Sequence, residues 1–448
     1  EAGRFPLDEA TVRTTGRSLA LRLAEQSGRA PHVVTGRDTR ESGAWIERAL
    51  TEGAREAGAR VESAGVITTP GVAYLTRVLG AGAGVVVSAS HNPFQDNGIK
   101  IFSPSGRKLD DATERLIEAD ISEAGPQNKR EGEGLEPRTE ISEHTEAAGL
   151  KERYLDYLCE EAGAGLSLAG LHVVVDCANG AAYGLAPALF ERLGARVTAL
   201  NNSPDGRNIN LDCGSLHIKG LQQGVAEKGA DLGVAYDGDA DRALFVDAWG
   251  HFVDGDATLW ALAKHWHARG LLESRTVVAT VMSNIGLELA LGSKGLRLAR
   301  ADVGDKYVLE ELLRTGAELG GEQSGHIIFP RQSLAGDGML TTLNLLRAMS
   351  DTGAGLDHLI EDFERYPQVL VNVRVREKLP FEEVRAVAQA SREVEAKLGG
   401  RGRLLLRYSG TEPLARVMLE GERQDEIERY ANTLASVIKE HLGMKDEA

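Results

Sequence analysis

Residues 84–102 read GVVVSASHNPFQDNGIKIF. The apolar run Val85–Val87 predicts a buried strand, and this strand ends abruptly in a polar loop that carries Ser90 and His91. Lys100 follows ten residues after Ser90, beyond a turn-forming Asp-Asn-Gly at 96–98. A serine at a strand end and near cations is suited to carry a phosphoryl group, whereas the structural alternative is a simple Ser-Asn-Pro turn. No serine of the candidate loops lies in a G-x-S-x-G motif, so a hydrolase nucleophile elbow is absent.

Strands and helices alternate on both sides of this stretch. The pattern predicts strands at 30–36, 81–89, 171–177, 196–200, 231–239, 276–282 and 318–329, and helices at 45–58, 154–163 and 186–194. Such alternation favours α/β layers with mainly parallel sheets. Beyond about residue 365 the pattern changes to strands at 369–376, 403–408 and 414–420 with helices at 381–397 and 423–441. Adjacent strands favour an α+β unit there.

The fold class expected is therefore α/β, with three similar α/β domains of mixed, mainly parallel sheets and a smaller C-terminal α+β domain. The predicted boundaries are 1–146, 147–247, 248–365 and 366–448. Residues 122–146 are polar and interrupted by Gly and Pro, which is typical of a surface loop or linker.

Composition excludes several classes of partner. The chain has 51 basic and 67 acidic residues, a net charge of −16, which argues against nucleic acid or an anionic membrane. No stretch approaches the roughly 18 apolar residues of a membrane span. The three cysteines, Cys159, Cys177 and Cys213, lack metal-type spacing and fit a reducing compartment, so we expect a cytoplasmic protein. The chain starts at Glu1 without a methionine, and we expect a few native residues before it.

The clearest chemical motif is DGDADR, residues 237–242, directly after the strand LGVAY. Asp237, Asp239 and Asp241 can be aimed at one point by a tight turn, and their hard oxygens suit Mg²⁺. An EF-hand is excluded because its sixth and twelfth positions are Arg242 and Ala248 here instead of Gly and Glu. An acidic surface loop and a phosphatase with Asp237 as its nucleophile remain alternatives.

Two further motifs supply polar groups. In RYSGTEPLAR (407–416), the arginines Arg407 and Arg416 flank a turn with two hydroxyls, and this is the local basic cluster that an acidic protein needs to hold phosphate. The alternative is a turn with solvated arginines. In GGEQSGH (320–326), Glu322 can accept hydrogen bonds from sugar hydroxyls and His326 can carry a proton, although a lone histidine is more often structural.

Together SASHNP, DGDADR, GEQSGH and SGTEP resemble, in the same order, the signature loops of the α-D-phosphohexomutase superfamily. Gln323 and Gly410 resemble its bacterial phosphoglucosamine mutase branch, as do the stretches at 303–312 and 335–343. The resemblance covers nearly the whole chain and implies a central cleft between four domains. The family's N-terminal G-T-D-G-x-R-G segment would precede Glu1, and we expect the native protein to carry it.

The resemblance implies an intramolecular phosphotransferase that interconverts glucosamine 6-phosphate and glucosamine 1-phosphate for UDP-N-acetylglucosamine and cell-wall synthesis. Phosphoserine 90 would exchange its phosphoryl group with the sugar through a bisphosphate, with Mg²⁺ held by Ser90, Asp237, Asp239 and Asp241. Lys100 and His326 would be general acid and base, supported by His91 and Arg242. Gly304, Asp305, Glu322 and Ser324 would contact the sugar. The remaining phosphate would be held by the phosphate clamp, which we define as Arg407, Ser409, Gly410, Thr411 and Arg416.

The resemblance also implies a sugar phosphate as the small-molecule partner and a bisphosphorylated sugar, or another phosphoryl donor, to activate Ser90. It leaves a homodimer open. Two other functions are compatible with the motifs: a phosphomannomutase or phosphoglucomutase of the same fold, and a non-catalytic sugar-phosphate sensor. Retention of Ser90, the three aspartates and Lys100 argues against the sensor, since a sensor need not keep the phosphoryl carrier.

Overall fold

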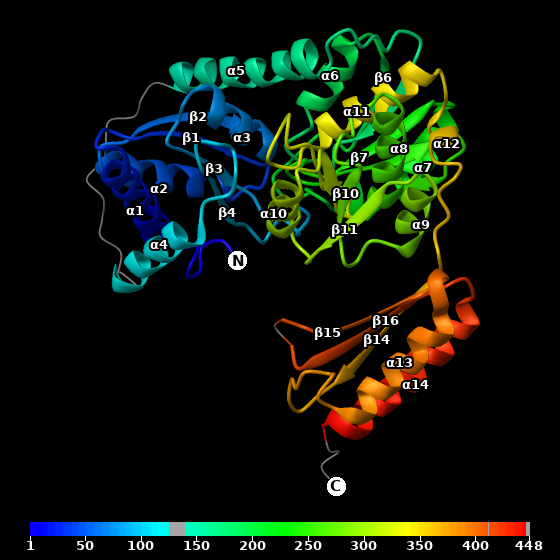
Figure 1. Cartoon of the computed structure of the whole chain (residues 1–448). Coiled ribbons are helices and arrows are strands. Elements are labelled where there is room, and N and C mark those ends of the chain that lie inside the picture. The colour runs from blue at the N-terminus through cyan, green and yellow to red at the C-terminus, as the bar shows by residue number, and fades with distance from the viewer. Residues whose placement is uncertain (125–139, 411, 445–448) are drawn as a thin grey trace.

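The computed structural model describes residues 1–124, 140–410 and 412–444, and its strands form four separate sheets (Figure 1). The predicted fold class is confirmed: three sheets are mixed and mainly parallel, and the fourth, near the C-terminus, is antiparallel. No helix among the described residues meets the length and apolarity needed to cross a membrane.

The first three sheets share one arrangement of strands. In each, three parallel strands are followed by a strand that pairs antiparallel with the third of them, and the second sheet adds β9 beyond this strand. The strand orders are β2-β1-β3-β4, β6-β5-β7-β8-β9 and β11-β10-β12-β13. The strands are β1 (His32–Arg37), β2 (Arg60–Val66), β3 (Ala83–Val87), β4 (Ile99–Phe102), β5 (His172–Asp176), β6 (Arg196–Leu200), β7 (Leu232–Tyr236), β8 (Ala243–Asp247), β9 (Phe252–Val253), β10 (Thr276–Thr280), β11 (Arg297–Ala301), β12 (Leu319–Gly321) and β13 (Ile327–Ile328).

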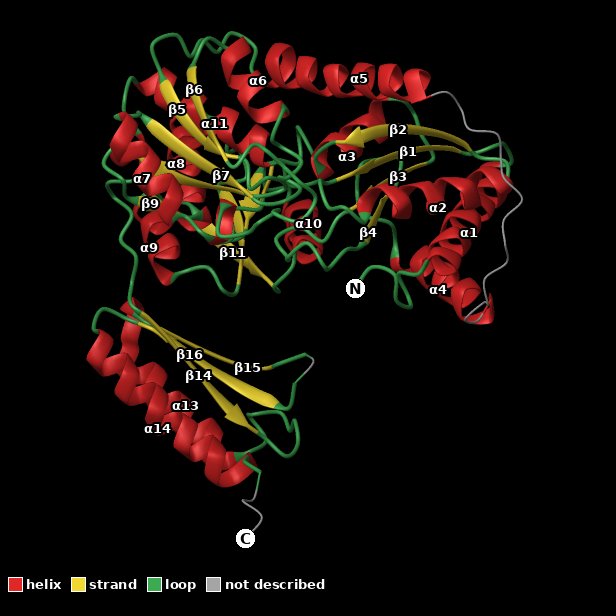
Figure 2. Ribbon diagram, turned by 180° about the vertical axis from the view of Figure 1, so that it is seen from behind, coloured by secondary structure: helices red, strands yellow, loops and turns green. Residues whose placement is uncertain are grey.

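Helices cover these sheets (Figure 2). They are α1 (Glu9–Ser27), α2 (Gly43–Glu56), α3 (Thr69–Val78), α4 (Asp111–Ala124), α5 (Glu140–Asp156), α6 (Leu185–Arg192), α7 (Lys219–Lys228), α8 (Gly255–Ala268), α9 (Ile285–Ser293), α10 (Asp305–Thr315), α11 (Gly338–Thr352) and α12 (Leu356–Leu359). A π-helical turn at Tyr157–Ala162 and a 3₁₀ turn at Gly214–Leu216 complete the list. We call the three similar sheets with their helices, in chain order, the first, second and third blocks. Helix α5 packs on β2 and α3 of the first block and also contacts α6, so it joins the first two blocks (Figure 2).

The first three blocks share one apolar core. A single buried cluster contains side chains from all three sheets, among them Val34, Val175 and Val277. The central strands β3, β5, β7 and β10 are buried along their whole length, which explains their continuous apolar sequences in mainly parallel sheets. This shared cluster ties the three blocks together, and smaller separate clusters lie elsewhere in each of them.

The C-terminal domain has its own core. Its sheet order is β14-β16-β15, and helices α13 and α14 cover one face of it (Figure 1). The elements are β14 (Gln368–Arg374), α13 (Arg385–Leu398), a 3₁₀ turn at Gly399–Arg401, β15 (Arg403–Tyr408), β16 (Leu414–Glu420) and α14 (Gln424–Leu442). Its buried apolar side chains all come from this domain, so it can fold and move as one body.

One buried carboxylate joins the C-terminal domain to the third block. Glu420 is fully buried and accepts hydrogen bonds from the backbone N–H of Ile285 at 3.1 Å and from Nε of Arg403 at 2.9 Å. The Arg403 guanidinium also donates to the carbonyl of Ser283 at 3.1 Å. The connection is therefore narrow and polar, in contrast to the apolar core shared by the other three blocks.

Two sequence predictions need correction. The strand expected at 318–329 is split into β12 and β13, because residues 322–326 form a tight turn between them. The loop expected at 122–146 is helical at both ends, where α4 extends to Ala124 and α5 begins at Glu140. The part of that predicted loop at 125–139 lies outside the described residues.

Candidate active site

Three of the four signature motifs occupy the same connection in the three similar sheets. This connection follows the third parallel strand and precedes the antiparallel strand: it carries residues 88–98 after β3, residues 237–242 after β7 and residues 322–326 after β12. Open α/β sheets bind ligands beyond the carboxyl ends of their parallel strands, and these polar motifs lie at such ends. The shared topology therefore explains why each of these motifs directly follows a strand.

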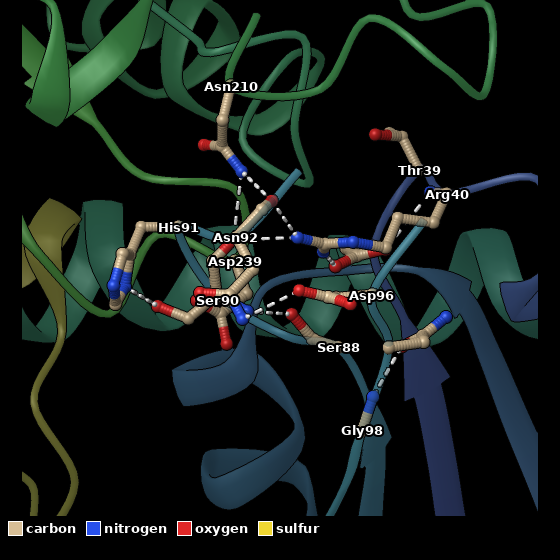
Figure 3. Close-up of polar contacts among 12 residues, drawn as sticks. Thr39, Arg40, Ser88, Ser90, His91, Asn92, Asp96, Gly98, Asn210 and Asp239 are labelled. Atoms are coloured by element: carbon tan, nitrogen blue, oxygen red, sulfur yellow. Dashed lines mark hydrogen bonds and ion pairs between the residues drawn. The ribbon is translucent and has the colours of Figure 1, made fainter. Parts of the chain in front are cut away.

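Ser90 lies near the start of the loop after β3, which we call the Ser90 loop (residues 88–98) (Figure 3). Its hydroxyl donates to Oδ2 of Asp237 at 2.5 Å and lies 3.3 Å from Nδ1 of His91. Burial, together with the nearby Arg242, lowers the pKa of His91, so its ring is neutral at pH 7. The predicted meeting of Ser90 with the acidic loop is thus present in the structure.

The three aspartates form a compact cluster, which we call the acid triad (Asp237, Asp239 and Asp241). Each offers one carboxylate oxygen, and these oxygens all lie within 4.8 Å of one another. The carboxylates are buried, and one oxygen each of Asp239 and Asp241 has no hydrogen-bond partner among the described residues. Three buried carboxylates that converge on one point repel one another, and such an arrangement is costly unless cations compensate the charge. The triad could therefore bind a metal, and its all-oxygen donor set fits Mg²⁺.

The Gly238 position explains the glycine of this motif. A Cβ atom at Gly238 would lie 2.5 Å from the carbonyl oxygen of Ser90 and 2.9 Å from Nδ2 of Asn210. Both are closer than real contacts allow, so only glycine lets the Ser90 loop approach the triad this closely.

Two cations lie against the triad. Lys100, on β4, places Nζ 2.6 Å from Asp239 and 3.3 Å from Asp241, and His326 places Nδ1 3.6 Å from Asp241. Burial acts to lower the pKa values of Lys100 and His326, but the neighbouring carboxylates outweigh it and raise both. Both residues are thus set to hold protons beside the site.

Asp237 is harder to ionise than an ordinary aspartate. Burial, followed by the charges of Asp241 and Asp239, raises the pKa of Asp237 to about 8. Arg242 opposes this shift, and its backbone N–H donates to Oδ1 of Asp237 at 3.2 Å. Full ionisation of the triad therefore needs more positive charge than the cationic side chains around it supply.

The loop after β12, which we call the sugar loop (residues 322–326), joins three predicted sugar contacts. Glu322 accepts from the backbone N–H of Gly304 at 3.1 Å and from the hydroxyl of Ser324 at 3.2 Å. Gly325 has φ of +88°, and a Cβ there would lie 2.3 Å from the carbonyl of Ala243, next to the acid triad. The sugar loop is thereby fixed against the metal loop, which explains why the predicted strand breaks here.

Asp305 lines a cavity of about 620 Å³ between the first and third blocks. Its carboxylate is 2.7 Å from Nζ of Lys108, and the nearby His326 and Lys108 lower its pKa despite burial. Four predicted site residues, Lys100, Asp241, Asp305 and His326, line this cavity, whereas Ser90 and Glu322 do not. The cavity thus reaches the acid triad at Asp241.

The phosphate clamp lies in the C-terminal domain, apart from these loops (Figure 1). Arg407 and Arg416 are direct partners across β15 and β16, and Ser409 is buried beside them, with its hydroxyl 3.4 Å from Nη2 of Arg416. Burial and Arg416 lower the pKa of Arg407. Like charges placed opposite each other destabilise a sheet, so this pair favours binding of an anion.

In the parts of the chain that the structure describes, no hydrogen bond or ion pair joins the clamp to Ser90, the acid triad or the sugar loop. Gly410 lies at the tip of the turn, and Thr411 lies outside the described residues. Three loops are therefore assembled in this structure and the fourth is separate.

Sequence reasoning missed several polar residues at the site. Arg40 and Asn210 donate to backbone carbonyls of the Ser90 loop, and the hydroxyl of Thr69 bonds to Asp239. Lys378 donates to the carbonyl of Ser409 at 2.6 Å. For Arg40 a signal was present, because TGRDTR runs from β1 into a polar strand end just as the Ser90 loop follows β3.

Comparison with known families covers most of the chain. Models of the phosphoglucomutase/phosphomannomutase family match as alpha/beta/alpha domain I at 1–128, domain II at 152–250, domain III at 254–366 and the C-terminal domain at 370–437. Four domains of this fold in this order are characteristic of the phosphohexomutases. The chain belongs to the phosphoglucomutase/phosphomannomutase family.

Relatives of known name agree with this assignment. The chain is 50% identical over 445 residues to phosphoglucosamine mutase of Solibacter usitatus, covering 99% of this chain and 97% of the relative. It is 47% identical to phosphoglucosamine mutase of Koribacter versatilis over 447 residues, covering 99% and 95%.

Solved structures share the fold. A phosphoglucomutase/phosphomannomutase family protein of Burkholderia thailandensis superimposes with a TM-score of 0.77 at 23% identity, covering 98% of this chain and 95% of that one. The N-acetylphosphoglucosamine mutase of Aspergillus fumigatus, in complex with GlcNAc-6P and magnesium, gives a TM-score of 0.62 at 20% identity, covering 94% and 80%.

Proposed function

We propose that this chain interconverts glucosamine 6-phosphate and glucosamine 1-phosphate through a phosphoserine at position 90 and a sugar bisphosphate. The observation that carries the proposal is the contact of the Ser90 hydroxyl with Asp237, inside a buried acid triad that fits a metal. The relatives named phosphoglucosamine mutase, 45–50% identical over nearly the whole chain, support glucosamine as the sugar.

The transfer is a balanced exchange at phosphorus. A sugar hydroxyl attacks the phosphorus on Ser90 while the bond from phosphorus to Ser90 Oγ breaks, and the sugar becomes a bisphosphate. Lys100 and His326 lie beside the triad, and their raised pKa values keep them protonated, so they are suited to protonate the leaving oxygen. The proton of the attacking hydroxyl would pass to whichever of the two has released its own. After the bisphosphate turns around, Ser90 Oγ takes the other phosphoryl group and the second sugar phosphate leaves.

The residues that would hold Mg²⁺ are Asp237, Asp239, Asp241 and Ser90, through Oγ or an oxygen of its phosphate. When bound, Mg²⁺ would neutralise charge on the phosphoryl group as it is attacked. His91 and Arg242 flank the same oxygens and would support them.

Sugar binding needs the separate loops to come together. Gly304, Asp305, Glu322 and Ser324 would contact the sugar hydroxyls from the third block, while the phosphate clamp would hold the phosphate that is not reacting. Because the clamp belongs to a domain with its own core and a narrow polar connection, we propose that this domain rotates towards the sugar loop when a sugar phosphate binds.

Activation and assembly remain part of the proposal. Ser90 would first receive its phosphoryl group from a bisphosphorylated sugar or another donor. The cytoplasmic location, the homodimer and the domain boundaries given above stay predictions from the sequence.

The test combines an assay with a mass measurement. Purified protein is assayed with the 6-phosphates of glucosamine, mannose and glucose side by side, and its intact mass is measured before and after incubation with a sugar bisphosphate. We expect the highest kcat/KM with glucosamine 6-phosphate and one added phosphoryl group that maps to Ser90. Preference for mannose or glucose phosphate would indicate the other mutases of this fold. Labelling of Asp237 would indicate a phosphatase, and binding of sugar phosphate without turnover would indicate a sensor.

A further inference from the structure

The backbone of the Ser90 loop adopts a conformation that serine rarely adopts. Ser90 has φ of +51°, in the left-handed region that favours glycine, asparagine and aspartate. A non-glycine residue is kept there only where its surroundings determine the backbone, and such positions cluster at functional sites. The contacts that hold this conformation are therefore of functional interest.

Two side chains hold the loop by the same two carbonyl oxygens (Figure 3). Arg40, between β1 and α2, donates from Nη2 to the carbonyl of Ser90 at 3.1 Å and to that of Asn92 at 2.5 Å. Asn210, between β6 and α7, donates from Nδ2 to the same carbonyls at 3.0 Å each. One donor comes from the first block and the other from the second, so the loop is fixed from both sides.

The supporting side chains are themselves fixed. Arg40 is completely buried as a side chain and forms an ion pair with Asp38, whose other oxygen accepts the backbone N–H of Arg40 at 3.0 Å. Asn210 has a left-handed backbone with φ of +58°, and its backbone N–H donates to the carbonyl of Ala178 at 2.9 Å. These contacts leave the two donor groups little freedom to rotate.

The hydroxyl of Ser90 is aimed by this arrangement. Because the Ser90 carbonyl is held by Arg40 and Asn210 and lies against Gly238, its side chain is directed towards Asp237. We propose that Arg40 and Asn210 are positioning residues that hold the Ser90 loop in the one conformation from which Ser90 can exchange its phosphoryl group. This inference rests on the proposed function, and it assigns to Arg40 the support of two carbonyl groups instead of contact with the phosphate.

The charge of Arg40 and its shape can be tested separately. Arg40→Lys keeps the positive charge, but a single ammonium on a flexible stem does not reproduce the rigid guanidinium that contacts Asp38 and both carbonyls. Arg40→Met removes the charge as well. Asn210→Ala removes the second donor, which belongs to the second block. It tests the same two carbonyl contacts even if substitution of the buried Arg40 prevents folding.

Thr39→Val is the matched control. The hydroxyl of Thr39 donates to the carbonyl of Asn179 at 2.6 Å, so it joins the same two blocks next to Arg40 but makes no hydrogen bond with the Ser90 loop. A loss of activity shared by Thr39→Val and Asn210→Ala would therefore report weaker contact between the blocks.

Three measurements are made on each full-length variant: the split between kcat and KM, the rate of Ser90 phosphorylation by a sugar bisphosphate in a single turnover, and amide hydrogen exchange across residues 88–98. We expect Arg40→Lys and Arg40→Met to lower kcat about 100-fold, since a misplacement of about 1 Å has that effect, and Asn210→Ala to lower it about tenfold. KM should change less than about threefold, exchange in the loop should accelerate, and Thr39→Val should stay within about twofold.

Several outcomes would overturn the inference. Normal turnover of Arg40→Lys beside a large loss in Arg40→Met would show that charge alone is required. Equal losses in Thr39→Val and Asn210→Ala would show that adhesion between the blocks is what matters. Unchanged hydrogen exchange in the Ser90 loop of Arg40→Lys and Asn210→Ala would also refute it, and this readout stands even if the wild-type protein proves inactive as a mutase. If the wild type is inactive but hydrogen exchange in the Ser90 loop still accelerates in Arg40→Lys and Asn210→Ala, the proposed function alone would be refuted.

Discussion

The Ser90 loop and the phosphate clamp differ in how the rest of the structure holds them. The Ser90 loop is held by side chains of two blocks, contacts the acid triad directly and belongs to three blocks that share one apolar core. The clamp lies in a domain with a separate core, joined to the rest by polar contacts around Glu420. In the proposed mechanism, the reacting groups would therefore be fixed in advance, while the distant phosphate would be bound by a domain that moves.

This difference has a physical reason. Phosphoryl transfer depends on the position of a few atoms, so the groups around phosphorus gain from rigidity. In the proposed mechanism, the clamp, in contrast, would bind either of two phosphates on a sugar that turns around during the reaction. A closed and rigid clamp would prevent the substrate from entering and the intermediate from reorienting.

The largest expected effect comes from the phosphoryl carrier. Ser90→Ala removes the atom that forms the bond to phosphorus, so we expect mutase turnover to fall roughly 10⁴-fold or more. Binding of glucosamine 6-phosphate at the clamp should persist, because Ser90 and the clamp are not in contact. Calorimetry measures whether glucosamine 6-phosphate still binds, and a coupled assay measures the loss of turnover. Ser122→Ala is the control, since Ser122 is an exposed serine of α4 in the same block and its hydroxyl donates to the carbonyl of Glu118. Nearly normal turnover in Ser90→Ala would remove the basis of the proposed mechanism.

The next effect concerns the clamp. Arg416→Ala removes charge-assisted contacts to phosphate worth about 1.5–3 kcal/mol, so KM should rise about 10- to 100-fold. The single-turnover transfer of a phosphoryl group to Ser90 at saturating bisphosphate should change little. Arg423→Ala is the control, since Arg423 is an exposed arginine of the same domain paired with Asp425. Unchanged KM values for both sugar phosphates would argue against the clamp.

The third effect separates the two regions by pH. Burial and the neighbouring carboxylates raise the pKa of Asp237 to about 8, so a proton competes with the metal at the acid triad below that pH. Apparent Mn²⁺ affinity, measured by electron paramagnetic resonance on unphosphorylated protein, should therefore rise up to about tenfold per pH unit towards pH 8 and then level off. Guanidinium groups do not deprotonate in this pH range, so no matching change is expected at the arginine-based clamp. Metal affinity that does not change between pH 6 and 8 would contradict this reading.

The sequence predicted most of the fold because the central strands are unusually clear. Runs such as VVV at 85–87 are buried on both faces, and their apolar character is visible without a structure. The C-terminal strands at 403–408 and 414–420 lie where they were expected. Helix α1 was not predicted, since it contains Thr11, Thr14, Thr15 and Gly16, which are weak helix formers, and is stabilised by its packing against α2.

The candidate site was predicted where its residues form local motifs and missed where they do not. Asp237, Asp239 and Asp241 lie within five residues of one another, so their meeting is a property of one turn. Arg40 and Asn210, in contrast, act on carbonyl groups 50 and 120 residues away, and this depends on how the first two blocks pack. The separate position of the clamp likewise depends on the orientation of a whole domain, which no local pattern encodes.

The smallest expected effect concerns how the clamp turn is held. Lys378 lies outside the motif, but its Nζ donates to the carbonyl of Ser409 at 2.6 Å and to that of Gly410 at 3.4 Å. Lys378→Met keeps most of the side-chain length and removes these donors. Because a hydrogen bond of this kind contributes about 1 kcal/mol, we expect KM for glucosamine 6-phosphate to rise about fivefold with kcat unchanged. Lys397→Met is the control, since Lys397 of the same domain lies over the ring of Tyr430 instead of near the turn. A fall in kcat with constant KM would show that Lys378 acts on the reacting phosphate. The proposed separation between a fixed reaction centre and a mobile clamp would then not hold for Lys378.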